Sequence, residues 1–122
     1  MCVLIVEDDL SSRMLIGQTL QRAGFEIVEA VDGAAALVLL QSRRFDFVIL
    51  DLLLPRVKGV DIIRAIFADE TLAKMPLLVF SAHEDLDGLQ LRPQDRFLLK
   101  PASPRVISEI AQAFLSDLSA SC

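Results

Sequence analysis

The sequence predicts one α/β domain, in which helices cover both faces of a five-stranded parallel sheet. Five short apolar runs follow one another along the chain and are separated by stretches with helical periodicity. Strands that alternate with helices pair in parallel through right-handed crossovers, which gives a doubly wound sheet. With 122 residues, 53% hydrophobic and 24% charged, the chain suits one folded core. We therefore expect a single domain over residues 1–122, with no output domain present.

Each predicted strand is a short run rich in β-branched and aromatic residues. The third run has an acid on each side and no polar residue inside, which indicates a strand buried on both faces. The second run contains Glu26 and Glu29, so we place it near an edge of the sheet. The five predicted strands are Val3–Val6, Phe25–Ala30, Phe47–Leu50, Leu77–Phe80 and Arg96–Leu99.

Helix signals fill most of the connections between these strands. Ser11 or Ser12 can cap the first helix, Asp9 in the acidic turn before it can also do so, and Gly24 ends it. An alanine-rich run favours the second helix, the third follows Gly59, and Pro104 suits the first turn of the last. These positions predict helices after the first, second, third and fifth strands.

The connection between the fourth and fifth strands carries the weakest helix signal. Residues 84–91 have helical character, but Gly88 weakens it and Pro93 stops it. We expect the fourth helix to be short or irregular.

Charge and hydropathy exclude several classes of protein. A net charge of −5 and a pI near 4.7 disfavour direct binding to nucleic acid, because phosphates would be repelled. The longest apolar run, residues 34–40, is far below the ~18 residues needed to cross a bilayer, so no membrane insertion is expected. No basic and apolar leader precedes the first strand. We expect a cytoplasmic protein.

Charged or reactive side chains follow four of the five predicted strands. Glu7 and Asp8 follow the first strand, Asp51 the third, Ser81 the fourth and Lys100 the fifth. The carboxyl ends of parallel strands lie at one edge of a sheet, so these groups can converge there. With strand order 2-1-3-4-5, the first and third strands flank the topological switch point, where such sheets place their ligands.

Three neighbouring carboxylates would raise one another's pKa unless a cation lay among them. Carboxylate oxygens with room for water and phosphate suit Mg²⁺. A lysine and a hydroxyl on the other side can contact a phosphate, so the set predicts phosphoryl transfer with one aspartate as nucleophile. A nucleotide-binding enzyme is disfavoured, because no glycine-rich loop follows the first strand.

The sequence resembles the receiver domain of two-component response regulators, a CheY-like superfamily. The resemblance covers the whole chain and rests on five fragments in register, each weak when taken alone. These fragments are Val3–Asp9, Val48–Pro55, Gly59, Phe80–Ala82 and Leu98–Pro101. It implies a flavodoxin-like fold with strand order 2-1-3-4-5.

The resemblance also implies a phosphoacceptor and a metal site. Asp51 would accept a phosphoryl group from a phosphohistidine. Glu7 and Asp8 would hold Mg²⁺ together with Asp51 and the backbone carbonyl of Leu53. A leucine side chain at position 53 cannot orient attacking water.

The same resemblance assigns phosphate contacts and a switch. Ser81, Ala82 and Lys100 would contact the phosphoryl oxygens, and the Lys100–Pro101 bond would be cis. Phe97 would turn inward when Ser81 moves, so that the face formed by the fourth helix, fifth strand and fifth helix changes for a partner. As a hypothesis, His83 influences the lifetime of the acyl phosphate.

Partners and activity follow from this resemblance as expectations. The phosphate would come from a sensor histidine kinase or a histidine phosphotransfer protein, and an unidentified downstream protein would read the switch, with a homodimer as one option. The domain would not be an enzyme beyond self-phosphotransfer and auto-dephosphorylation. The alternative is a receiver-like interaction domain that acts without phosphorylation.

Overall fold

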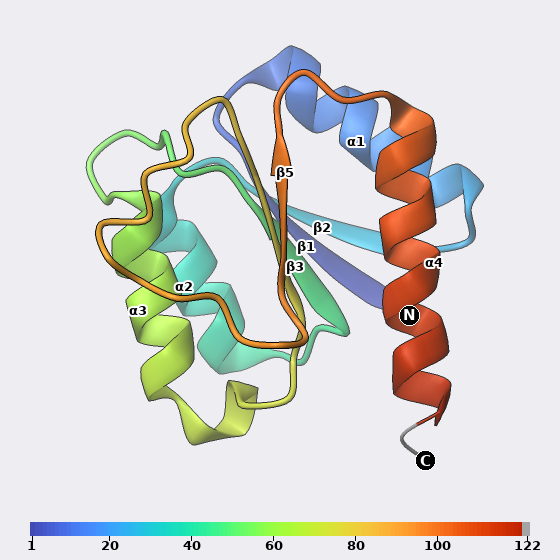
Figure 1. Cartoon of the computed structure of the whole chain (residues 1–122). Helices are drawn as coiled ribbons and strands as arrows, with labels where there is room; N and C mark the ends of the chain where they lie inside the picture. The colour runs from blue at the N-terminus through green and yellow to red at the C-terminus, as the bar shows by residue number, and fades with distance from the viewer. Residues whose placement is uncertain (121–122) are drawn as a thin grey trace.

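The computed structural model describes residues 1–120, with side chains described through residue 116. Five parallel strands form one sheet in the order β2-β1-β3-β4-β5, which confirms the predicted topology (Figure 1). Strand β2 lies at an edge, as its acidic residues indicated. The strands are β1 Cys2–Val6, β2 Glu26–Ala30, β3 Phe47–Leu50, β4 Leu77–Ser81 and β5 Arg96–Leu99.

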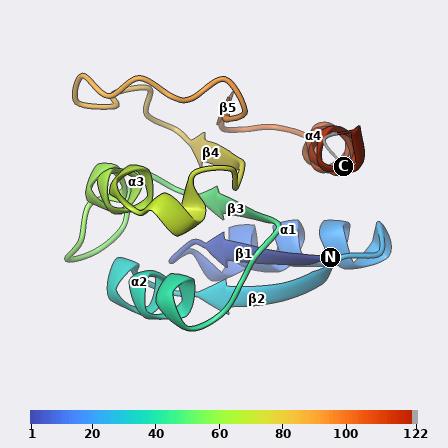
Figure 2. The same ribbon diagram turned by 90° about the horizontal axis from the view of Figure 1, so that it is seen from below.

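Helices cover both faces of this sheet. Helices α2 and α3 lie on one face, and α1 and α4 lie on the other, as Figures 1 and 2 show from two directions. A single turn of 3-10 helix, η1, follows α3 and was not predicted. The helical segments are α1 Leu10–Arg22, α2 Gly33–Ser42, α3 Gly59–Ala68, η1 Glu70–Leu72 and α4 Pro104–Ala120. None of the helices in the described residues is long and apolar enough to span a bilayer.

The central strand β3 is buried along its whole length, as predicted. Because side chains alternate across a strand, Val48 and Leu50 join the core beneath α2 and α3, while Phe47 and Ile49 join the core beneath α1 and α4. The β1–β3 register pairs Val6 with Leu50. The residues that follow, Glu7 and Asp51, therefore leave the sheet side by side.

The start of α1 decides between the predicted caps. Asp9 caps the helix, as its place in the acidic turn indicated, and Ser11 and Ser12 do not; the Asp9 carboxylate accepts a hydrogen bond of 2.9 Å from the Ser12 N–H. The helix begins at Leu10, so both serines lie in its first turn. After its last turn, Gly24 has φ of +96°, a left-handed conformation that glycine adopts without strain.

No helix forms between β4 and β5 in the described chain, so the expected short or irregular fourth helix is replaced by turns over residues 82–95. Asp87 and Gly88 both have positive φ, 53° and 78°, and two such residues in a row break a right-handed helix. The segment extends past α3 before it returns to β5 (Figure 1).

Candidate functional site

The side chains predicted to converge do meet at the carboxyl edge of the sheet. Glu7 follows β1, Asp51 follows β3 and Ser81 ends β4. Lys100 follows β5 and is tied to β4 by its N–H, which donates to the Ser81 carbonyl at 2.9 Å. Backbone register alone therefore brings together residues up to 93 positions apart in sequence.

An ammonium group lies between two buried carboxylates at the centre of this site. Lys100 Nζ is 3.1 Å from both carboxylate oxygens of Glu7 and 3.0 Å from Asp51 Oδ2. Glu7 and Asp51 are only 2% and 6% exposed, so these contacts are poorly screened by water. Lys100 Nζ also lies 5.3 Å from the centre of the Phe80 ring. The lysine is the cation that the buried acids require.

The two carboxylates respond differently to this environment. Burial, together with hydrogen bonding and charge repulsion from Asp51, raises the pKa of Glu7 to about 7, although Lys100 opposes this. Burial also acts to raise the pKa of Asp51, but hydrogen bonds from the Leu53 N–H and Lys100 outweigh it and lower that pKa. Burial acts to lower the pKa of Lys100, but its bonds to Asp51 and Glu7 raise it. Asp51 is thus the acid that stays ionised.

The turn after β3 fixes the orientation of the Asp51 carboxylate. The Leu53 N–H donates to Asp51 Oδ1 at 3.0 Å, so Oδ1 is held by the backbone while Oδ2 faces Lys100. Gly59 closes this turn, and its N–H donates to the Leu52 carbonyl. A Cβ at position 59 would lie 2.5 Å from the Leu52 Cα and 2.7 Å from the Asp51 carbonyl oxygen, so only glycine fits.

The acidic turn after β1 is positioned by a residue that the sequence analysis did not single out. Arg13 Nη1 donates to the Glu7 carbonyl at 3.0 Å and to the Asp8 carbonyl at 3.4 Å. Its Nε is 3.4 Å from Glu29 on β2. An arginine early in a helix carries no sequence signal for such a role, because the contacts depend on where β1 and β2 end.

Three acids could hold a divalent cation here. Glu7, Asp8 and Asp51 each offer a carboxylate oxygen, and these oxygens all lie within 4.8 Å of one another. Asp8 is exposed, whereas the other two are buried, so the group opens to solvent on one side. Hard oxygen donors with a solvent-facing side fit Mg²⁺, which keeps several of its waters. The Leu53 carbonyl as a further ligand stays a prediction.

The residues at the end of β4 lie beside Asp51. Ser81 is fully buried, its hydroxyl contributes to the lowered pKa of Asp51, and its Oγ accepts from the His83 N–H at 3.3 Å. Ala82 and His83 are both exposed at the mouth of the site. The influence of His83 on phosphate lifetime stays a prediction.

Two further predicted features lie on β5 and just after it. The Lys100–Pro101 peptide bond is cis, as expected. Phe97 is half-buried, pairs with Val79 across the strands, and packs against the core beneath α2 and α3. Phe97 thus lies on β5, three residues before Lys100, and its role as a switch residue stays a prediction.

A second hollow lies at the opposite, amino-terminal edge of the sheet. It has a volume of about 660 Å³ and is lined by residues 40–46 and by the turn after α3. Its wall includes Arg43, Arg44 and Lys74 but none of the five convergent residues. The convergent site is therefore separate from this hollow.

Comparison with known proteins agrees with this geometry. The family described as "Response regulator receiver domain" matches residues 3–112. The chain is 35% identical to the chemotaxis protein CheY of Pseudomonas aeruginosa, over 89% of this chain and 91% of that protein. It is 31% identical to the phosphate regulon transcriptional regulatory protein PhoB of the same organism, over 93% of this chain but only 51% of that protein.

Solved structures share the fold. Chemotaxis response regulator CheY4 of Vibrio cholerae is 28% identical, with a TM-score of 0.80 over 93% of this chain and 97% of that chain. A CheY-like receiver domain protein from Methanospirillum hungatei has a TM-score of 0.89 at 19% identity, over 99% and 98% of the two chains. With the matched family covering most of the chain, this protein belongs to the response regulator receiver domain family.

Proposed function

We propose that this receiver domain is a phosphorylatable switch of a two-component or phosphorelay system, with Asp51 as the phosphoacceptor. One observation carries the proposal: Asp51 is a buried carboxylate that stays ionised because Lys100 and the Leu53 N–H both donate to it. An ionised carboxylate can act as a nucleophile, and the adjacent ammonium compensates the charge that the phosphoryl group brings.

The transfer needs no co-reactant other than the donor. An Asp51 oxygen forms a bond to phosphorus as the P–N bond of a phosphohistidine breaks, and the released imidazole takes up a proton. The products are an acyl phosphate and a neutral histidine on the donor. Lys100 Nζ, which is 3.0 Å from Asp51 Oδ2, would then contact the phosphoryl oxygens.

Glu7, Asp8 and Asp51 would hold Mg²⁺, with the Leu53 carbonyl as a further ligand. The ion would neutralise charge on the phosphoryl oxygens during transfer. In this arrangement Glu7 would exchange part of its contact with Lys100 for the metal, which frees the ammonium for the phosphate.

Phosphorylation would act on the end of β4. A phosphoryl group adds a charge of about −1.5 to −2 and three strong acceptor oxygens. The Ser81 hydroxyl and the Ala82 N–H would donate to these oxygens, and Phe97 would fill the space that Ser81 leaves. The face that would change consists of residues 82–95, β5 and α4, since turns stand where the fourth helix was expected.

Partners follow from this chemistry. The donor would be a sensor histidine kinase or a histidine phosphotransfer protein, and an unidentified downstream protein or a second copy of the chain would read the changed face. The domain would perform self-phosphotransfer and auto-dephosphorylation but no other catalysis, and it would act in the cytoplasm. The chain spans about half the length of PhoB, so an output is proposed only for the receiver itself.

The second candidate is an interaction domain of the same fold that never takes phosphate. The complete set of Asp8, Asp51, Ser81 and Lys100 favours the switch, because a binding domain has no need for a metal site and a paired ammonium. The two candidates differ in one measurable property, which is the modification of Asp51.

The test incubates the protein with Mg²⁺ and acetyl phosphate and locates added phosphate by mass spectrometry. We expect one acyl phosphate on Asp51, labile to base and to hydroxylamine, that is absent without Mg²⁺. Asp51→Asn should abolish it, whereas Asp46→Asn, an acid just before β3, should not. A folded protein without phosphate on Asp51 would establish the interaction domain instead.

A further inference from the structure

The connection between β4 and β5 is held in two different ways along its length. It leaves the sheet after Ser81, beside the phosphoacceptor, passes α3 and re-enters the sheet at Arg96 (Figures 1 and 2). Residues 92–95 are fastened by a dense set of hydrogen bonds, whereas residues 82–91 are not. The boundary between the two parts lies at Arg92.

Asp95 fastens the last part of the connection to the start of β4. It is 5% exposed, and its Oδ1 accepts from the Leu77 N–H at 2.9 Å. Its Oδ2 accepts from the Arg92 N–H and from Arg92 Nε, each at 2.9 Å. One buried carboxylate thus joins two backbone segments 18 residues apart in sequence.

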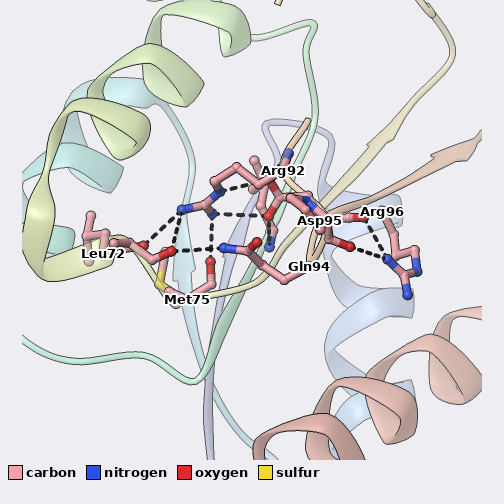
Figure 3. Close-up of polar contacts among 9 residues, drawn as sticks. Leu72, Met75, Arg92, Gln94, Asp95 and Arg96 are labelled. Atoms are coloured by element: carbon pink, nitrogen blue, oxygen red, sulfur yellow. Dashed lines mark hydrogen bonds and ion pairs between the residues drawn. The ribbon is translucent and has the colours of Figure 1, made fainter. Parts of the chain in front are cut away.

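Arg92 extends this contact to the turn between α3 and β4 (Figure 3). Its Nη1 donates to the Leu72 carbonyl at 3.0 Å, and its Nη2 donates to the Met75 carbonyl at 2.7 Å and to Asp95 Oδ1 at 3.1 Å. The guanidinium also lies 4.7 Å from the centre of the Phe67 ring on α3. The planar guanidinium satisfies carbonyls and a carboxylate at once, which a lysine could not do.

The preceding part of the connection has weaker attachments. Its ion pair, Asp87 with Arg64 at 2.8 Å, joins side chains that are 70% and 43% exposed. Asp85 accepts from the Asp87 N–H, which is a local turn. Leu86 and Leu89 are only partly buried against the core beneath α2 and α3. Screened pairs and partial burial restrain a segment far less than a buried charge network does.

We propose that Arg92 and Asp95 form a clamp that confines the backbone displacement caused by phosphorylation in the β4–β5 connection to residues 82–91, which then present the signal to a partner. The proposal rests on the proposed function of Asp51. In this proposal a loop takes the place of the helix in the expected output face. The loop is weakly held from residue 82 onward and is fixed at Arg92.

The two parts of the connection would lose different contacts if they moved, and this difference explains the confinement. Displacing residues 82–91 disrupts one exposed ion pair and partial apolar contacts. Displacing residues 92–95 would leave the buried Asp95 carboxylate without its arginine and the carbonyls of the α3–β4 turn without their donor. Buried groups left without partners make the second movement much less favourable. A displacement that begins at Ser81 should therefore end before Arg92.

Amide hydrogen exchange, measured residue by residue by NMR on the unphosphorylated protein, tests the clamp directly. In Arg92→Met we expect exchange of the Leu77 and residue-92 amides to accelerate by at least about tenfold, since both donate to Asp95. Arg96→Met is the matched control. Arg96 donates only to the Pro93 and Asp95 carbonyls in its own segment, so this variant should stay within about twofold of wild type.

The same measurement with Mg²⁺ and beryllofluoride, a phosphoryl mimic, tests the confinement. In wild type we expect changes in exchange over residues 82–91 that stop before Arg92, and in Arg92→Met we expect them to continue through Asp95. Changes across residues 92–95 of wild type, or unaltered exchange in unphosphorylated Arg92→Met, would overturn the proposal.

Two controls keep the outcomes separate. If Arg92→Met does not fold by circular dichroism, Arg92→Lys replaces it; this variant keeps the charge but not the paired donors, and it should show a smaller acceleration at Leu77. Phosphate on Asp51 is measured separately by mass spectrometry. Its absence refutes the proposed function, and the confinement with it, while exchange in the unphosphorylated variants still decides whether the clamp exists.

Discussion

Glu7 gives the metal-free protein a pH-dependent stability that Glu7→Gln should remove. The raised pKa means that the folded protein holds this proton more tightly than the unfolded chain, whose glutamate has its ordinary pKa of 4.5. Such a group stabilises the fold fully below pH 4.5, and that contribution is lost as the pH rises to about 7. Glutamine keeps the shape of the side chain but cannot titrate.

The magnitude follows from the two pKa values. A tenfold difference in proton affinity is worth ~1.4 kcal/mol, so a change from 4.5 to about 7 is worth ~3 kcal/mol in total. Between about pH 5.5 and about pH 8 the expected loss is ~2 kcal/mol. The shifts of Asp51 and Lys100 do not contribute there, because a lowered aspartate pKa acts below that range and a raised lysine pKa acts above it.

Urea denaturation in EDTA at a series of pH values measures this contribution. Wild type should lose ~2 kcal/mol of unfolding free energy across the range, and Glu7→Gln should lose much less. Adding Mg²⁺ at the upper end should restore stability in wild type, because the ion binds the ionised carboxylates of the folded state. An equal pH dependence in both proteins would refute the link between the buried Glu7 and stability.

Three other perturbations address the site and its turn. Lys100→Met should lower the yield of phosphate on Asp51 by about tenfold or more, measured by mass spectrometry with acetyl phosphate, because the ammonium that faces the acceptor oxygen is lost. Gly59→Ala should lower the unfolding free energy by ~2 kcal/mol or more in thermal denaturation, since its Cβ would overlap backbone. Gly17→Ala is the matched control and should cost less, because its Cβ would meet only the ends of flexible side chains and no backbone; equal losses would contradict the argument. His83→Ala should change the rate at which phosphate is lost from Asp51, and an unchanged rate would remove this residue from the mechanism.

Local patterns in the sequence were sufficient to predict the strands and the side chains that meet at their carboxyl ends. The run from Phe47 to Leu50 is apolar at every position, and such a run is stable only as a strand buried on both faces. Asp51, Ser81 and Lys100 each end or follow such a run, so their convergence required only that the strands be parallel. The resemblance to receiver domains rested on the same residues and was confirmed by the family match.

Local patterns did not predict the conformation correctly where a segment has a similar propensity for two alternatives. Ser12 and Asp9 can both cap a helix, and the choice depends on how β1 turns into α1. Residues 84–91 have helical composition, but the chain adopts turns there because Asp87 and Gly88 are left-handed. Contacts with the rest of the fold decide which residue caps the helix and which conformation the segment adopts.

The sequence by itself predicted the strands, the helices after the first, second, third and fifth of them, and the side chains that meet at the strand ends, because apolar periodicity and strand-end position are local properties. Only the tertiary structure decided how those side chains act on one another. The shared ammonium of Lys100, the raised pKa of Glu7 and the clamp of Arg92 on Asp95 depend on burial and on distances between segments far apart in the chain. Electrostatic interactions are strong only where packing excludes water, and packing is a property of the whole fold.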